Sequence, residues 1–130
     1  MKNLEFNEIL KKLKKNKFDD FDVIIAIGRG GIVPASLVQN ILKRDMEILW
    51  LNFRDEKHCP KRKKPKLVKE INFDFKNKKI LLVDDVSRTG ETLNKAKKIL
   101  KGNKIKTFVI NGEADYSLYN FKECIKFPWG

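Results

Sequence analysis

The sequence has few cysteine and histidine residues, which cross-link small folds or bind structural metals. Its two cysteines, Cys59 and Cys124, form no Cys-x-x-Cys pair, and the 130 residues include one histidine. We therefore expect neither a structural disulfide nor a zinc site. Long hydrophobic runs are also missing. The longest apolar stretch covers residues 23–28, whereas a membrane helix needs about 20 residues.

The amino terminus, MKNLEFNEILKKLKK, has no apolar block followed by a small-residue cleavage site, so we predict no signal peptide. A chain of this length usually forms one domain, with enough residues for one core. Apolar residues make up 42% and charged residues 35%, which is typical of a globular chain rather than a disordered one. We expect a single domain, covering residues 1–130, in the cytoplasm.

Positive charge is what the sequence has in excess. Twenty-nine basic residues against 17 acidic ones give a net charge of +12. Such a surplus suits a nucleic acid, an anionic membrane surface or a phosphorylated small molecule. Most of the cations are lysines, and they are spread from Lys2 to Lys126. This spread argues against one dedicated nucleic-acid patch, and nucleic acid stays a minor alternative.

Segments with strand and helix patterns alternate along the chain. The buried strands that we expect are apolar on both faces, as in a parallel sheet. The pattern predicts an α/β fold with helices on both sides of the sheet. Strands are predicted at 22–28, 46–53, 78–85, 104–111 and 123–127, with a short flanking one in 67–73; helices are predicted at 3–15, after Pro34 and after Gly90; and a cationic loop covers 54–66.

The first candidate for a ligand site is the glycine loop that follows the first buried strand, Gly28-Arg29-Gly30-Gly31. Its glycines let the backbone approach a ligand closely, and Arg29 adds a permanent cation with a forked set of donors. The loop lacks the spacing of the known phosphate-binding glycine motifs. It is therefore either an anion site or a tight strand-to-helix turn.

The second candidate follows a later strand. Asp84 and Asp85 are adjacent carboxylates at the end of a buried segment, and burying both is costly without a cation or strong donors. A divalent metal or the vicinal hydroxyls of a sugar would resolve this. The following residues, 87–92 (SRTGET), open a helix and offer hydroxyls and free N–H groups to a phosphate. A simple helix cap at Ser87 or Thr89 explains the hydroxyls but not the paired acids.

Both loops leave the sheet at its carboxyl edge, where such sheets bind ligands. Together they predict a phosphorylated sugar that carries a second anionic group.

These segments resemble a known family. ILLVDDVSRTGETL (80–93) resembles the ribose-phosphate signature of the type I phosphoribosyltransferases, and IAIGRGGIVPASLV (25–38) is similar to the family's pyrophosphate loop, most of all in its 6-oxopurine branch. CIKFPWG (124–130) resembles the purine-binding tail of xanthine–guanine phosphoribosyltransferases. The resemblance runs from the first strand to the last residue.

The resemblance implies a type I phosphoribosyltransferase fold: a five-stranded parallel core, flanking helices and a mobile hood loop. It implies a Mg2+-dependent enzyme of nucleotide salvage that joins a nucleobase, in this branch a purine, to ribose 5-phosphate. The donor would be phosphoribosyl pyrophosphate, with release of pyrophosphate. Family members are commonly homodimers.

The family's roles transfer by position. Asp84 and Asp85 would hold the ribose hydroxyls and Mg2+, and Arg29 would contact pyrophosphate as a catalytic cation. The bond from Gly28 to Arg29 falls where the family often has a cis non-proline peptide. The remaining substrate-binding positions would be Gly28, Gly30 and Gly31 in the first loop and Ser87, Arg88, Thr89, Gly90, Glu91 and Thr92 in the second. The hood would supply one of three cations, Lys57, Arg62 or Lys64.

Three positions depart from the 6-oxopurine pattern, all on the base side. Arg88 replaces an aspartate that accepts a proton from the base, and an arginine cannot do so at neutral pH. Asn111 aligns with a lysine that reads the 6-oxo group, and Cys124 replaces an aromatic residue that stacks on the purine. Asn111, the backbone of Ile125 and the ring of Trp129 remain as base contacts.

Three explanations stay open. The enzyme uses a base that needs no proton acceptor, or it binds a purine through rearranged contacts. Alternatively, the chain is a non-catalytic sensor of phosphoribosyl pyrophosphate or a nucleotide, related to the family's RNA-binding attenuators. We favour an enzyme over a sensor.

Overall fold

The computed structural model describes residues 1–52, 66–67 and 70–130. Lys57, Arg62 and Lys64, the predicted hood cations, lie outside the described residues. The helices of the described part are α1 (Phe6–Lys15), α2 (Ile32–Leu42) and α3 (Glu91–Ile99). Its strands are β1 (Lys2–Asn3), β2 (Val23–Gly28), β3 (Asp45–Asn52), β4 (Lys66–Leu67), β5 (Lys79–Ser87), β6 (Lys104–Gly112), β7 (Tyr116–Tyr119) and β8 (Ile125–Lys126).

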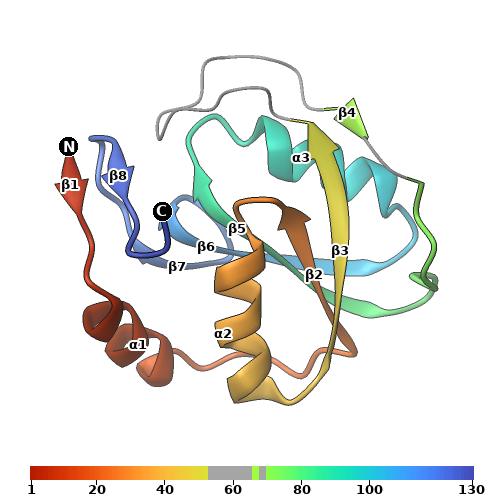
Figure 1. Cartoon of the computed structure of the whole chain (residues 1–130). Helices are drawn as coiled ribbons and strands as arrows, with labels where there is room; N and C mark the ends of the chain where they lie inside the picture. The colour runs from red at the N-terminus through yellow and green to blue at the C-terminus, as the bar shows by residue number, and fades with distance from the viewer. Residues whose placement is uncertain (53–65, 68–69) are drawn as a thin grey trace.

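The main sheet has the strand order β4-β3-β2-β5-β6-β7 (Figure 1). Strands β3, β2, β5, β6 and β7 are mutually parallel, and β4 pairs antiparallel to β3. The predicted five-stranded parallel core is therefore confirmed. The chain moves from β2 to β3 on one side and later returns to β5 on the other. Strands β2 and β5 thus flank the switch point of strand order, where such sheets bind ligands.

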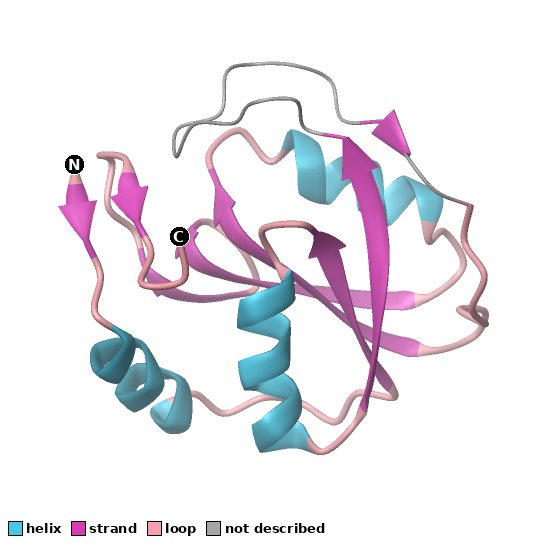
Figure 2. Ribbon diagram, viewed as in Figure 1, coloured by secondary structure: helices cyan, strands magenta, loops and turns pink. Residues whose placement is uncertain are grey.

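Helices cover both faces of the sheet, as predicted (Figure 2). Buried residues of α1 and α2, including Ile9, Leu13 and Val38, pack against one face in a single apolar cluster. Leu93 and Ala96 of α3 belong to a second cluster on the opposite face. Every residue of β2 is buried, which explains its apolar sequence, VIIAIG.

The two ends of the chain meet in a small second sheet. Strand β1 pairs parallel with β8, and Lys2 is in register with Ile125. The prediction that the segment 123–127 adds a strand to the main sheet is wrong in this respect. The last strand is shorter, covers Ile125–Lys126 and lies beside the amino terminus.

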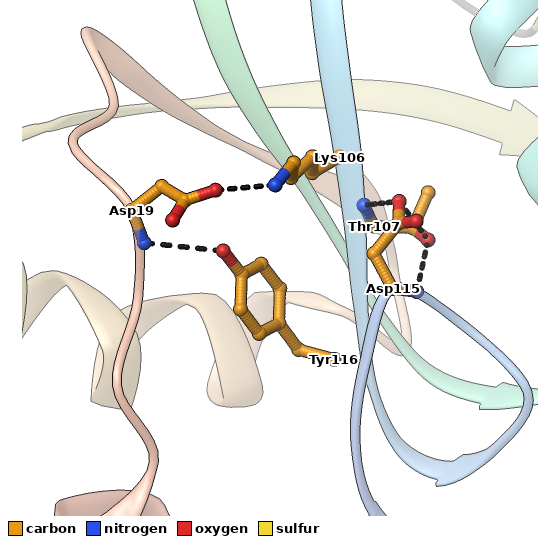
Figure 3. Close-up of polar contacts among 5 residues, drawn as sticks. All are labelled: Asp19, Lys106, Thr107, Asp115 and Tyr116. Carbon is orange, nitrogen blue, oxygen red and sulfur yellow. Dashed lines mark hydrogen bonds and ion pairs between the residues drawn. The ribbon is translucent and has the colours of Figure 1, made fainter.

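Strand β7 takes the place at the edge of the main sheet, and the sequence pattern did not predict it. Side-chain contacts attach it to its neighbours (Figure 3). Asp115, just before β7, accepts hydrogen bonds from the backbone N–H and the hydroxyl of Thr107 at 2.8 and 3.2 Å. The hydroxyl of Tyr116 accepts from the backbone N–H of Asp19, whose carboxylate pairs with Lys106. These contacts join β7, β6 and the segment before β2.

In the part of the chain that the structure describes, no helix combines the length and apolarity that crossing a membrane requires.

Candidate functional site

The glycine loop leaves β2 through a cis peptide bond between Gly28 and Arg29, as the resemblance implied. Gly28 is buried and lies in register with Trp50 of β3. A Cβ at Gly28 would lie 2.6 Å from the Trp50 ring, so a side chain has no room there. The N–H of Gly31 donates to the carbonyl of Ile27 at 2.8 Å and turns the chain directly into α2. Arg29 is left exposed at the tip of the turn.

The glycine loop is in direct contact with the paired acids. A Cβ at Gly30 would lie 2.6 Å from Oδ2 and 2.8 Å from Oδ1 of Asp85. A Cβ at Gly31 would lie 2.3 Å from the backbone carbonyl of Val83, the residue before Asp84. The loops predicted to share one edge of the sheet therefore touch, and their glycines are what permits it.

The paired acids stand at the carboxyl end of β5, where burial keeps them from water. Asp84 is 7% exposed, and Asp85 is half-buried. Burial and the neighbouring charge of Asp85 raise the pKa of Asp84 well above its ordinary value. Burial also raises the pKa of Asp85. Because the two carboxyls resist being ionised at the same time, a bound cation would stabilise their charged forms.

The two carboxyls fit part of a Mg2+ site. One oxygen of each is held by the backbone: the N–H of Asp85 donates to Oδ1 of Asp84 at 2.8 Å, and the N–H of Val86 donates to Oδ1 of Asp85 at 2.7 Å. Within the described residues, no third acidic, histidine or cysteine side chain completes a metal cluster. Mg2+ binds proteins through one or two carboxylates, with phosphates and water as its other ligands, so the donor set fits an ion that arrives with a phosphorylated substrate.

The predicted phosphate cradle lies between β5 and α3. Gly90, not Ser87 or Thr89, is the N-cap of α3, and its φ of 81° is in the left-handed region that favours glycine. No side chain caps the helix from this position, although the hydroxyl of Thr89 accepts from the N–H of Glu91 at 3.3 Å. The first turn thus directs backbone N–H groups and the positive end of the helix dipole at the loop, as an anion requires. Thr92 lies in that first turn.

Gly112 fixes the start of this cradle from the neighbouring strand. It is in register with Ser87, and a Cβ at Gly112 would lie 2.1 Å from the Ser87 carbonyl. The sequence did not indicate this role for Gly112. An unremarkable glycine at the end of a strand gives no signal of such close packing.

The side chain of Asn111 is hydrogen-bonded within the protein. It is 2% exposed, and its amide oxygen accepts from the Phe121 N–H at 2.8 Å. Its amide nitrogen donates to the Phe121 carbonyl at 3.1 Å. Asn111 therefore supports the segment that leads to the carboxyl terminus. The sequence did not suggest this role, because the partner is backbone.

Ile125 and Trp129 lie in that same terminal segment. The N–H groups of Lys2 and Leu4 donate to the carbonyls on either side of Ile125, those of Cys124 and Lys126, at 2.8 and 3.0 Å. Because successive carbonyls of a strand point in opposite directions, that of Ile125 is directed away from β1. The Trp129 ring stacks on Phe127 at a centroid distance of 4.9 Å and meets Phe6 edge-on at 6.3 Å.

Cys124 corrects one expectation. It is disulfide-bonded, whereas the separation of the cysteines in the sequence predicted no structural disulfide. Distance in the fold, not along the chain, decides whether sulfurs can meet. The sequence holds one other cysteine, Cys59, which lies outside the described residues.

Known proteins match this chain over much of its length. Orotate phosphoribosyltransferase of Saccharolobus solfataricus is 32% identical over 93 residues, which are 71% of this chain and 43% of that protein. The chain thus matches less than half of the length of this curated relative. Among solved structures, a purine phosphoribosyltransferase of Pyrococcus horikoshii has a TM-score of 0.80 at 28% identity, covering 98% of this chain and 92% of that one.

A xanthine-guanine-hypoxanthine phosphoribosyltransferase of Helicobacter pylori shares the fold, with a TM-score of 0.71 at 16% identity over 98% of this chain and 90% of that one. The family described as "Phosphoribosyl transferase domain" matches residues 2–111. That range includes the glycine loop, the paired acids and the phosphate cradle. This chain therefore belongs to the phosphoribosyltransferase family.

Proposed function

We propose that the protein transfers ribose 5-phosphate from phosphoribosyl pyrophosphate to a nucleobase and releases pyrophosphate. The observation that carries this proposal is the contact between Gly30 and the Asp85 carboxyl. It supports a single site that combines a cationic glycine loop, two acids with raised pKa values and, directly after them in the chain, the start of α3. A sugar with a phosphate at one end and a diphosphate at the other matches these three features.

Each part of the site has a separate task in this proposal. Asp84 and Asp85 orient the ribose by accepting from its vicinal hydroxyls. The backbone N–H groups of residues 87–92 hold the 5-phosphate. Arg29 and the backbone of Gly30 hold the diphosphate and stabilise the negative charge that develops as the C1–oxygen bond breaks. The same two acids would hold Mg2+, which would supply further positive charge to the leaving group.

We propose a purine as the base. The Pyrococcus horikoshii structure covers nearly the whole chain and is named as a purine enzyme. The carbonyl of Ile125, directed away from β1, is suited to accept from an amino group or ring N–H of a base. Purine salvage, a cytoplasmic location and a homodimer remain predictions.

Orotate is the second candidate. The Saccharolobus solfataricus relative has this substrate in its name. Arg88 gives the base side a permanent cation where the purine pattern has an acid. A cation in this position favours a base that carries its own negative charge, as orotate does.

A panel of bases tests the proposal. Guanine, hypoxanthine, xanthine, adenine, uracil and orotate are each offered with phosphoribosyl pyrophosphate and Mg2+, and released pyrophosphate is measured. We expect release with at least one purine. Release with orotate alone would replace the purine by the second candidate. If no base leads to pyrophosphate release while calorimetry shows that phosphoribosyl pyrophosphate binds, the result would contradict the proposed enzyme activity and favour a sensor.

A further inference from the structure

We propose that Arg88 is a positioning residue that connects the phosphate cradle to the base side of the site. Its backbone belongs to the cradle, at residues 87–92, and its guanidinium holds the segment that precedes β8. A phosphate in the cradle would then order the place where the base binds. The inference rests on the function proposed above, and it assigns to Arg88 a role that differs from proton transfer and from phosphate binding.

The guanidinium contacts two successive carbonyls. Its Nη1 donates to the Lys122 carbonyl at 3.3 Å and its Nη2 donates to the Glu123 carbonyl at 3.1 Å. The planar fork of arginine suits two acceptors side by side, whereas a lysine offers one compact ammonium group. The partners lie 34 and 35 residues further along the chain, so the bonds join two separate parts of the fold.

The segment that Arg88 holds, residues 121–126, is here called the base-side segment. Other groups hold it as well: Asn111 of β6 binds both backbone groups of Phe121, the N–H groups of Lys2 and Leu4 bind the carbonyls of Cys124 and Lys126, and Cys124 is disulfide-bonded. Asn111 is buried within the main sheet. Arg88, in contrast, is exposed and comes from the loop that would receive the phosphate. Of these attachments, it is the one that a ligand in the cradle would affect directly.

Binding of a phosphate in the cradle should favour binding of the base. A phosphate that binds the backbone N–H groups of the cradle restricts the loop and thereby the position of the Arg88 side chain. The side chain then restricts residues 122–123, directly before the predicted base contact at Ile125. Binding of phosphoribosyl pyrophosphate should therefore raise the affinity for the base, and linkage requires the reverse effect to be equal.

Two variants and a control test this role. Arg88→Met removes both hydrogen bonds and keeps much of the side-chain bulk, and Arg88→Lys retains one donor group. Arg44→Met is the matched control, because Arg44 also donates to a backbone carbonyl, that of Phe21, at 2.9 Å, but on a segment outside the site. Amide hydrogen exchange of residues 121–126 is measured with and without phosphoribosyl pyrophosphate and Mg2+, alongside steady-state kinetics for the base and calorimetry of phosphoribosyl pyrophosphate binding without base.

We expect phosphoribosyl pyrophosphate to slow exchange in residues 121–126 of the wild-type protein and of Arg44→Met, but not of Arg88→Met. In Arg88→Met the KM for the base should rise about tenfold, since hydrogen bonds from a charged donor contribute at least this much, while the affinity for phosphoribosyl pyrophosphate without base stays within about twofold. Arg88→Lys should restore part of the effect. Unchanged exchange and unchanged base KM in Arg88→Met would overturn the proposal, as would a tenfold loss of affinity for phosphoribosyl pyrophosphate without base, which would place Arg88 in the phosphate site.

The exchange measurement separates this proposal from the proposed function. If the wild-type protein fails to bind phosphoribosyl pyrophosphate, the proposed function fails. The hydrogen bonds of Arg88 to the base-side segment are then tested in the ligand-free protein. The amides of residues 121–126 should exchange faster in Arg88→Met than in the wild-type protein. Equal rates there would overturn it.

Discussion

Alanine at Gly30 should lower ligand affinity and alanine at Gly31 should lower stability, although the two residues are neighbours. Neither has a positive φ, so alanine meets no backbone strain at either position. What differs is the atom that a Cβ would meet. At Gly30 it is the side-chain carboxyl of Asp85, at 2.6 Å, and at Gly31 it is the backbone carbonyl of Val83, at 2.3 Å.

The expected magnitudes follow from these distances. Ordinary contacts begin at 3.4 Å, so Gly30→Ala requires the Asp85 carboxyl to retreat by about 0.8 Å. A carboxyl displaced this far would lose hydrogen bonds to the ribose, and a hydrogen bond to a charged group contributes about 1.5–3 kcal/mol, or about 10- to 100-fold in affinity. The strands themselves can stay in place, because the carboxyl can move. Gly31→Ala instead pushes β5 and α2 apart, and overpacking of this kind costs about 3 kcal/mol.

Thermal unfolding and calorimetry measure the two effects. Gly30→Ala should lower the affinity for phosphoribosyl pyrophosphate in Mg2+ by about 10- to 100-fold and change the Tm by no more than about 3 °C. Gly31→Ala should lower the Tm by roughly 10 °C. Gly102→Ala is the control, because a Cβ there meets nothing within 4 Å and only the φ of 96° is unfavourable. Wild-type affinity in Gly30→Ala would refute the claim that the glycine loop and the acids form one site.

Two further predictions concern Asn111 and Asp84. Asn111→Ala leaves the backbone groups of Phe121 without their partner and should lower the free energy of unfolding by about 1–3 kcal/mol in urea, with the affinity for phosphoribosyl pyrophosphate kept; an unchanged stability would contradict the support role. For Asp84, the raised pKa means that the folded, metal-free protein binds more protons than the unfolded chain, so this group destabilises the fold as pH rises above the ordinary carboxyl range. Asp84→Asn should therefore be more stable than the wild-type protein at pH 7, with the difference vanishing in acid; a difference that persists unchanged in acid would contradict the assignment.

The parallel core was predictable because its strands are apolar on both faces. A run such as VIIAIG in β2 has no polar side, and only a sheet covered by helices on both faces buries it. The glycine loop and the paired acids were predictable for a related reason, since the ends of such strands share one edge.

The edges of the fold were not predictable in the same way. Strand β7 has the sequence YSLY and is only partly buried, so no apolar run marks it. Strand β8 is two residues long, and its pattern does not say whether it joins the main sheet or β1. Arg88 and Asn111 bind backbone groups of a segment whose position follows from the whole fold. Their residue types indicated hydrogen bonding but not the partner.

Calorimetry of phosphoribosyl pyrophosphate binding tests the central claim most directly. The titration is made with Mg2+ and with a chelator, for the wild-type protein and for the Asp84→Asn, Asp85→Asn double variant. The account predicts binding in the wild-type protein with Mg2+, and its loss both with the chelator and in the double variant. Equal affinity in the double variant and the wild-type protein would contradict it, because the ligand would then bind elsewhere than beside the paired acids.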